Sequence, residues 1–424
     1  MDVFDKLIKD GGPIGQHVDR AHGYFTFPKL EGELGSRMLF RGKEKIVWSL
    51  NNYLGLANHP EARKVDTEAA KKWGMGYPMG ARMMSGNSAQ HEDLEKVIAD
   101  FINREDVMLL NFGYQGIMSC IDALVNRRDV IVYDAESHAC IVDGIRLHMG
   151  YSYAYKHNNI DDCEKQLERA QKMAEKNGGG ILVITEGVFG MSGNQGKLKE
   201  ITALKKKYQF RLLIDDAHGF GSMGPTGGGA DEAQGCQDEV DLYFSTFVKS
   251  MGSIGAFIAG PKKVLTHLRY NVRSQIFAKS LPMIIVEGMI KRMEMLKTMP
   301  ELRKNLWHIV NRLQNGLREK GFDIGTTNSP VTPVYMKGDV PEASAMVTDL
   351  RENYNIFCSI VVYPVIPKGQ IIFRIIPTAA HTEEDTDITL KAFEETKKKL
   401  DAGEYRVEQI PDMSDVGKAM IGEM

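Results

Sequence analysis

Short apolar runs alternate with longer helical stretches between about residues 46 and 290. The apolar runs do not alternate with polar residues, which is typical of strands that are covered on both faces. Strands are expected at Val107–Leu110, Val130–Tyr133, Ile181–Thr185, Arg211–Ile214, Tyr243–Thr246 and Ala256–Ala259. Helical stretches such as Asn159–Lys176 and Lys197–Tyr208 separate several of these runs. This order predicts βαβ units and therefore an α/β fold with a mostly parallel central sheet.

The pattern changes after about residue 290. A helical stretch at Leu302–Lys320 is followed by three β-type runs and a final helix at Thr386–Leu400. The three runs are Thr332–Tyr335, Ser359–Val362 and Ile371–Ile375. We therefore expect four parts: an N-terminal arm (1–45), a large domain (46–290), a smaller C-terminal α+β domain (291–400) and a polar tail (401–424).

The composition is that of an ordinary globular protein, with 43% hydrophobic and 26% charged residues. A net charge of -3 argues against a nucleic-acid partner. No run approaches the roughly 20 apolar residues of a membrane span, so no integral membrane segment is expected. Five scattered cysteines without a CxxC pair or metal-ligand spacing predict reduced thiols, a cytoplasmic location and no metal site.

Polar residues with chemical potential follow three of the predicted strands. Asp215 and His218 follow one strand, Lys249 follows another, and His138 follows a third. In an open α/β sheet, ligands bind at the carboxyl ends of the strands. These side chains are therefore expected to share one site.

A cofactor with an aldehyde group and a pyridine ring would use this set of residues. A lysine amine forms an imine with an aldehyde, a carboxylate keeps a pyridine nitrogen protonated, and a histidine ring can stack on the pyridine. The N–H groups of Gly113 and Tyr114, in NFGYQG at the start of a helix, suit a phosphate, and Thr246 adds a hydroxyl group. Each feature also has an ordinary interpretation: a surface lysine, a helix cap or solvated turn at Asp215–Asp216, or a simple Gly-Tyr turn.

Four strings occur in an order that is specific to one family. They are SLNNYLGLANHP (49–60), HEDLEKVIADF (91–101), DDAHGFGSMGPTGGG (215–229) and STFVKSMGSIGAFIAG (245–260). Through them, roughly residues 40–400 resemble the α-oxoamine synthases, which include serine palmitoyltransferase and aminooxononanoate synthase. The resemblance implies fold type I (aspartate-aminotransferase-like), pyridoxal 5'-phosphate (PLP) as the cofactor, and a homodimer with shared active sites.

The same resemblance implies a role for each residue at the strand ends. Lys249 holds PLP as a Schiff base, and Asp215 pairs with the pyridine nitrogen. His218 contacts the phenolic oxygen of the cofactor, and His138 stacks on its ring and helps to orient the amino acid. Lys249, His138 and His218 are thereby the implied catalytic residues.

Further roles follow from the resemblance. Gly113, Tyr114 and Thr246 serve the phosphate, and Asn52 belongs to the substrate-binding set. Arg374, in IIFRIIPTAAHT, matches the family arginine that engages the substrate carboxylate, a task that suits its paired donors. An arginine exposed on an edge strand is the alternative at position 374.

The family reaction is a decarboxylative Claisen condensation of a small amino acid with an acyl thioester. By resemblance, Lys249 removes the Cα proton and His138 steadies the acyl carbonyl as charge develops. The thiol of CoA or of acyl carrier protein leaves, and CO2 is released. The sequence leaves open which of the two thioesters is used.

Two segments depart from the usual family pattern. GMGYPMGARMMSGNS (74–88) keeps Arg82, expected to bind substrate, but carries Met83 and Met84 where smaller or branched residues are usual. Methionines suit a long acyl chain, although ordinary core packing would also explain them. RSQIFAKSLPM (273–283) has Ala278 and Lys279 in place of hydroxyl residues. Lys279 adds a positive charge near the phosphate or the substrate side chain, unless it is simply exposed.

A third departure is Ser192, in EGVFGMSGNQG, where an acidic residue is usual. Together the departures favour an amino acid more anionic than serine. The chain resembles Bacteroidota enzymes that are similar to serine palmitoyltransferase but use L-cysteate to begin sulfonolipid (capnine) synthesis. Three alternatives remain: serine as the substrate and thus sphingolipid synthesis, a PLP aminotransferase sharing Lys249 and Asp215, and a non-catalytic partner subunit, which would lack Lys249.

Overall fold

A computed structural model describes residues 2–9, 12–15 and 17–415. The chain divides into two compact units. One unit is Asn51–Asn305, and the other combines Met1–Leu50 with Leu306–Met424. The strands β1 (Leu30–Glu31), β2 (Arg37–Phe40) and β3 (Lys43–Val47), from the N-terminal part of the chain, belong to the second unit. Residues 416–424 of the predicted tail lie outside the described residues.

The larger unit is built on a seven-stranded sheet of order β4-β10-β9-β8-β7-β5-β6. Only β10 runs antiparallel to its neighbours, so the predicted mostly parallel sheet is confirmed. The strands are β4 (Asp106–Leu110), β5 (Val130–Asp134), β6 (Tyr151–Tyr155), β7 (Ile181–Glu186), β8 (Arg211–Asp215), β9 (Leu242–Thr246) and β10 (Ala256–Gly260). The unpredicted strand β6 lies at the sheet edge and is mostly exposed, so it lacks the apolar run that marks the others.

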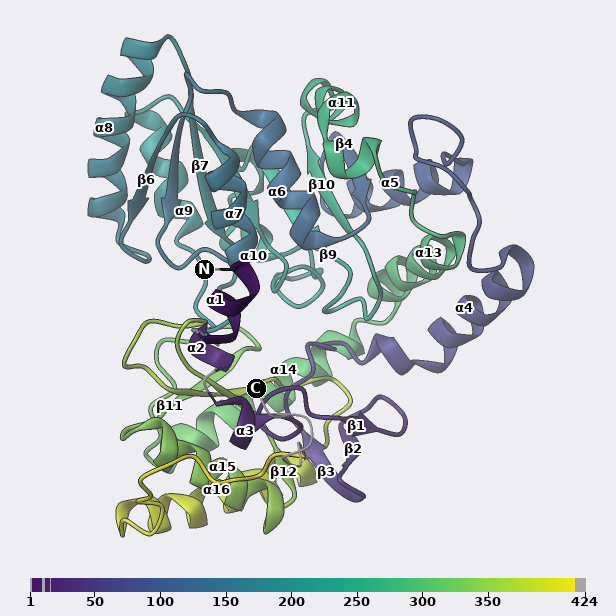
Figure 1. Cartoon of the computed structure of the whole chain (residues 1–424). Coiled ribbons are helices and arrows are strands. Elements are labelled where there is room, and N and C mark those ends of the chain that lie inside the picture. Colours follow the sequence, from purple (N-terminus) through teal and green to yellow (C-terminus); the bar gives the residue numbers. More distant parts are fainter. Residues whose placement is uncertain (1, 10–11, 16, 416–424) are drawn as a thin grey trace. The chain divides into compact units, whose positions relative to one another are not determined.

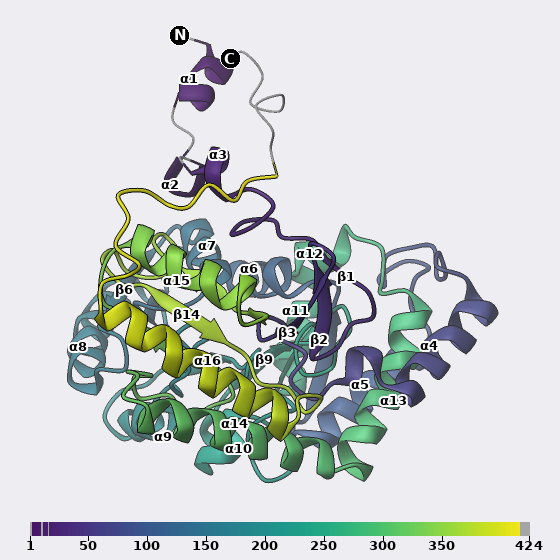
Figure 2. The same cartoon turned by 90° about the horizontal axis from the view of Figure 1, so that it is seen from below.

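Helices cover both faces of this sheet, with α6 and α7 on one face and α9 and α10 on the other (Figures 1 and 2). Buried aliphatic residues such as Ile117, Ile121 and Ile141 pack between the first pair and the strands. The helices of the unit are α4 (Pro60–Trp73), α5 (Ala89–Phe101), α6 (Gly113–Leu124), α7 (Ala139–Leu147), α8 (Ile160–Asn177), α9 (Leu198–Ala203), α10 (Ala230–Gln234), α11 (Lys262–Asn271), α12 (Arg273–Ile276) and α13 (Met283–Thr298), with short 3-10 turns at Leu56–Asn58, Leu204–Lys206 and Gln237–Glu239.

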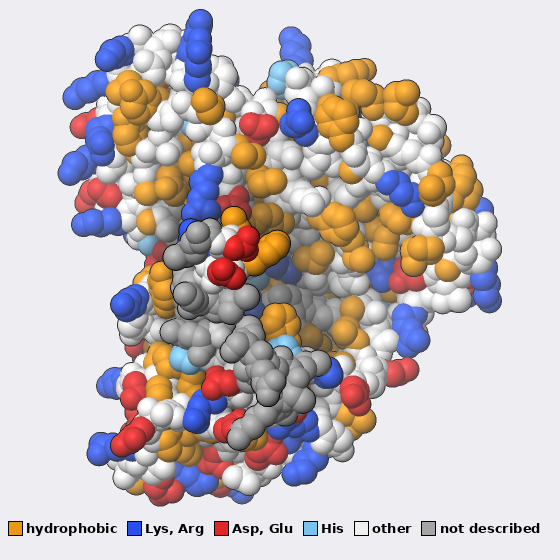
Figure 3. Space-filling model, in the orientation of Figure 1, with side chains coloured by type: hydrophobic (Ala, Val, Ile, Leu, Met, Phe, Trp, Pro, Cys, Tyr) orange, Lys and Arg blue, Asp and Glu red, His pale blue; other side chains and the backbone are white. Residues whose placement is uncertain are grey.

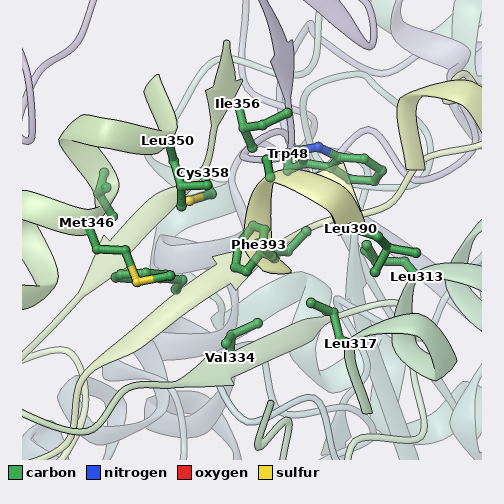
Figure 4. Packing of buried hydrophobic residues seen from close by; sticks show 14 of the residues in the cluster. Trp48, Leu313, Leu317, Val334, Met346, Leu350, Ile356, Cys358, Leu390 and Phe393 are labelled. Carbon is green, nitrogen blue, oxygen red and sulfur yellow. The ribbon is translucent and has the colours of Figure 1, made fainter. Parts of the chain in front are cut away.

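The smaller unit has two sheets, β1-β2-β3-β12 and β11-β14-β13, together with helices from both ends of the chain. Its further elements are α14 (Glu301–Glu319), β11 (Thr332–Tyr335), α15 (Val340–Glu352), β12 (Ile356–Phe357), β13 (Ser359–Val361), β14 (Ile372–Ile375) and α16 (Glu383–Asp401), after α1 (Val3–Lys9), α2 (Gly12–Gly15) and α3 (Val18–Ala21). Trp48 lies fully buried among aliphatic side chains of this core (Figure 4). Its Nε1 donates to Thr389 Oγ1 at 3.0 Å, so the buried indole N–H is satisfied.

Helix caps explain where two elements begin. α16 starts three residues before the predicted Thr386, because Thr382 and Asp385 form a capping box. α15 was not predicted, although Asp339 caps it through the N–H of Glu342 and a proline stands in its first turn. Among the described residues, no helix is both long and apolar enough to cross a membrane.

Candidate active site

The carboxyl ends of the central parallel strands bring the candidate residues to one edge of the sheet. β5 ends at Asp134, β7 at Glu186, β8 at Asp215 and β9 at Thr246. Glu186 and Asp215 are register partners, so two buried carboxylates lie side by side. The sequence predicted the place of Asp215 but not that of Glu186, which is the last residue of its strand.

Asp215, Lys249 and His138 are close enough to influence one another's charge. Burial raises the pKa of Asp215, while the charges of Lys249 and His138 pull it down. Burial lowers the pKa of His138, Asp215 opposes that shift, and Lys249 adds to it. The structure therefore brings these three predicted residues together.

Both the side chain and the backbone of His138 are hydrogen-bonded. It is the N-cap residue of α7, and its Nδ1 accepts the N–H of Cys140 at 3.3 Å. Its own backbone N–H donates to Glu186 Oε1 at 2.6 Å. Burial, together with the charge of Asp215, raises the pKa of Glu186 well above its usual range. Glu186 thus anchors His138 beside the acid that is expected to meet the pyridine ring.

His218 is fixed by a tyrosine that the sequence reasoning missed. The hydroxyl of the fully buried Tyr53 lies 2.6 Å from His218 Nδ1. Ser222 Oγ donates to the His218 carbonyl at 2.7 Å, which stabilises the turn after β8. Tyr53 lies within the string SLNNYLGLANHP, so only its position in that string could have indicated its role.

Asp216 stabilises the same turn through two hydrogen bonds. Its Oδ2 accepts the N–H of Ala230 and the hydroxyl of Tyr243, each at 2.8 Å. Burial and the nearby Asp231 raise the pKa of Asp216 well above its usual range. Because both Asp215 and Asp216 are buried, the solvated-turn interpretation of this pair is wrong.

The expected phosphate site is formed by α6 and β9. No side chain caps the N-terminus of α6 among the described residues, which leaves its first turn suited to an anion. A Cβ atom added to Gly113 would lie 3.4 Å from both Cβ and Oγ1 of Thr246, so the helix end and this threonine are adjacent. Tyr114 places its ring edge-on to that of His138, with the centroids 6.1 Å apart.

This geometry fits PLP. An amine, a buried carboxylate and a histidine ring lie together at the strand ends, and the N-terminus of α6, the expected phosphate site, begins beside Thr246. PLP would supply an electron sink for a carbanion at the substrate Cα. No group of three His, Cys, Asp or Glu residues that could hold a metal ion occurs in the described part of the chain.

Two expected substrate residues already have partners in the protein. The Arg82 guanidinium binds Glu95 through two contacts, at 2.6 and 3.2 Å, and its Nε donates to Asn87 at 2.7 Å. Asn52 is buried, and its Oδ1 accepts the N–H of Ala57 at 3.1 Å. These contacts do not bring either residue to Lys249, Asp215 and His138, so a substrate role for each stays a prediction.

Lys279 and Arg374 have different surroundings. Lys279 is exposed, and its carbonyl accepts a hydrogen bond from the side chain of Asn111, which lies two residues before the start of α6. Arg374 is buried on β14, the central strand of its three-stranded sheet, so the alternative of an exposed edge-strand arginine is wrong. Ser192 donates to Asn194 Oδ1 at 2.8 Å and thereby supports its own loop.

Residues 43–393 match the family model of class I and II aminotransferases. The chain is 64% identical over 405 residues to a cysteate-C-fatty acyltransferase of Capnocytophaga ochracea, covering 96% of each chain. A serine palmitoyltransferase of Bacteriovorax stolpii is 34% identical over 378 residues, 89% of this chain and 88% of that one. A serine palmitoyltransferase of S. paucimobilis, solved with PLP and myriocin bound, superimposes with a TM-score of 0.88 at 28% identity, covering 95% of this chain and all of that one.

Fold and site together define a PLP enzyme of fold type I. Within the class I and II aminotransferase family, the chain belongs to the α-oxoamine synthases, the PLP-dependent C-acyltransferases that join an amino acid to an acyl group. The resemblance inferred from the four strings is therefore confirmed.

Proposed function

We propose that this enzyme condenses L-cysteate with a long-chain acyl thioester and releases CO2, as the first step of sulfonolipid (capnine) synthesis. The observation that carries the proposal is the 64% identity to a cysteate-C-fatty acyltransferase over 96% of both chains. Identity to a serine palmitoyltransferase is much lower, at 34%. Lys279 and Ser192 agree with the same choice, because a lysine in place of a hydroxyl residue and a serine in place of an acidic residue would each favour a substrate with an anionic side chain.

The roles of the side chains follow from their chemistry. Asp215, buried at the end of β8, would keep the ring nitrogen of the cofactor protonated and so maintain the ring as an electron sink. His218, held by Tyr53, would donate to the phenolic oxygen. Lys249 would hold the cofactor and act as the base that takes the Cα proton. His138 would donate a hydrogen bond to the acyl carbonyl as negative charge develops on its oxygen.

The remaining parts of the proposal concern partners and location. We place the enzyme in the cytoplasm as a homodimer with shared active sites, acting on an acyl-carrier-protein or CoA thioester. All five cysteines are free and buried, which agrees with a reducing compartment. Gly113, Tyr114 and Thr246 would bind the cofactor phosphate, and Arg374 would engage the amino-acid carboxylate.

Serine is the second candidate substrate, because solved serine palmitoyltransferases superimpose over nearly the whole chain. The two substrates differ in one group, a sulfonate in place of a hydroxyl. A binding site that uses a cation at that position should discriminate strongly between them.

The test is to titrate the purified holoenzyme with L-cysteate, L-serine and L-aspartate while recording the cofactor absorbance. We expect saturation by cysteate at a far lower concentration than by serine, with aspartate in between because it carries a carboxylate in place of the sulfonate. Tight serine binding without a cysteate response would make the enzyme a serine palmitoyltransferase. Formation of a keto acid without release of thiol and CO2 would instead identify an aminotransferase.

A pair of lysine variants tests the source of this discrimination. Lys279→Ala should weaken cysteate binding severalfold and leave serine binding unchanged, because it removes the extra cation near the expected phosphate site. Lys263→Ala, at another exposed lysine of the same unit, is the matched control and should change neither. Equal effects of the two variants would exclude Lys279 as the sulfonate-side cation.

A further inference from the structure

Cys140 makes two contacts with one atom of the His138 ring. Its backbone N–H lies 3.3 Å from His138 Nδ1, and its Sγ lies 2.9 Å from the same nitrogen. Both contacts form within the first turn of α7, for which His138 is the N-cap. The ring is therefore fixed by the residue two positions after it.

These two contacts determine where the ring carries its proton. A backbone N–H can only donate, so Nδ1 must offer its lone pair to Cys140 and cannot bear a hydrogen. The thiol then has to donate to Nδ1 as well, because two lone pairs at this distance would repel. The proton of a neutral His138 ring consequently lies on Nε2.

The thiol keeps its proton under these conditions. Cys140 is almost fully buried, and burial raises the pKa of its thiol well above the usual range. The charges of Asp215 and Glu186 act in the same direction, and that of Lys249 opposes them. A cysteine in this position is a hydrogen-bond donor and not a nucleophile.

We propose that Cys140 is a positioning residue whose thiol reinforces the Nε2–H tautomer of His138, which the backbone N–H of the same residue already favours. The inference rests on the proposed function, in which His138 contacts the cofactor and the acyl group. Nε2–H is then the donor that His138 presents to the reacting carbonyl, and the ring meets the substrate in a single hydrogen-bonding state. Removal of the thiol donor makes Nδ1 easier to protonate. The neutral ring with its proton on Nε2 is then less favoured.

The groups that face His138 set the pH dependence of this arrangement. Asp215 on β8 and Lys249 after β9 act on its charge in opposite directions, and Glu186 on β7 accepts its backbone N–H. Tyr114 on α6 presents its ring edge. A donor to Nδ1 stabilises the unprotonated ring, so its loss raises the pKa of His138.

Nitrogen-15 NMR of the histidine-labelled holoenzyme measures the tautomer directly. The protein has 11 histidines, and the signal that disappears in His138→Gln assigns the ring. We expect an unprotonated Nδ1 and a protonated Nε2 in the unmodified enzyme. In Cys140→Ala, His138 should protonate at higher pH, whereas Cys140→Ser, which restores a donor, should return it to the original value. Cys163→Ala, at a fully buried cysteine of α8, is the control for cavity formation and should leave the His138 signals unchanged.

Kinetics supply the second readout. In Cys140→Ala the acidic limb of the kcat/KM profile should move to higher pH and kcat should fall about threefold to tenfold, the range expected for one lost hydrogen bond. Cys140→Ser should restore both. A protonated Nδ1 in the unmodified enzyme, or Cys140→Ala spectra identical to it, would overturn the inference. Failure of cysteate to bind would overturn the substrate proposal alone, because the NMR signals do not depend on the substrate.

Discussion

Gly190, which has no side chain, limits the position of His218, one of the residues expected to be catalytic. A Cβ atom at this position would lie 2.3 Å from Nε2 of His218, far inside any permitted contact. On the other edge of the ring, the Tyr53 hydroxyl lies 2.6 Å from Nδ1. The ring of His218 is thus held between the hydrogen bond to Tyr53 and the backbone of Gly190, which together restrict it to one position.

Gly190→Ala should therefore displace His218 and impair the enzyme without unfolding it. We expect kcat/KM to fall by about 10-fold to 100-fold, as for a catalytic group displaced by about an ångström. The absorbance maximum of the bound cofactor should shift in the same variant. Gly180→Ala is the control, because a Cβ there meets Asp129 Oδ1 at an ordinary 3.7 Å. Unchanged kinetics in Gly190→Ala would exclude this steric role.

At the scale of elements, His381 joins the start of α16 to the strand that leads to Trp48. Its ring stacks on the Trp48 indole, with the centroids 3.9 Å apart and the planes 9° from parallel. Nδ1 accepts the N–H of Thr378 at 3.1 Å, so Nε2 bears the proton and donates to the Val47 carbonyl at 3.2 Å. Burial lowers the pKa of His381 from 6.5 to about 4, with Asp385 opposing part of the shift.

This buried neutral histidine predicts a loss of stability in mild acid. His381 binds a proton near pH 6.5 in the unfolded chain and only near pH 4 in the folded chain. Its contribution to the free energy of unfolding is therefore fully present above pH 6.5 and is lost as the pH drops toward 4. The loss amounts to roughly 3 kcal/mol for a shift of this size. Urea denaturation across this window should show a steeper decline for the unmodified protein than for His381→Gln. His267→Gln, at an exposed histidine of α11, should keep the original slope.

At the scale of the whole molecule, the expected homodimer needs an apolar surface to bury. Hydrophobic side chains gather over the region of α4, α5 and α13 in the larger unit (Figure 3). In the 74–88 segment between α4 and α5, Met79 and Met84 are 77% and 82% exposed. Monomeric proteins rarely expose such a cluster, which favours an occupant from a second copy.

A charged substitution tests this surface. Light scattering should give twice the 47.4 kDa chain mass for the unmodified enzyme. The Met79→Glu, Met84→Glu double variant should shift the equilibrium toward monomer and lower activity, because a charge in an apolar interface is costly. Met149→Glu, at a methionine that is 87% exposed outside this segment, should remain dimeric. A dimeric double variant would place the interface elsewhere.

The sequence by itself determined the α/β class, the central strands and the residues at their carboxyl ends, because buried parallel strands appear as apolar runs and ligand residues follow them directly. It also determined the family, through motifs that are contiguous in the chain. Tertiary structure alone decided what comes from distant segments: Tyr53 against His218, Glu186 beneath His138, the edge strand β6, and the union of the N-terminal strands with the C-terminal unit. The reason is physical, since periodicity reports burial along one element, whereas the partner of a buried polar group depends on which elements the fold packs together.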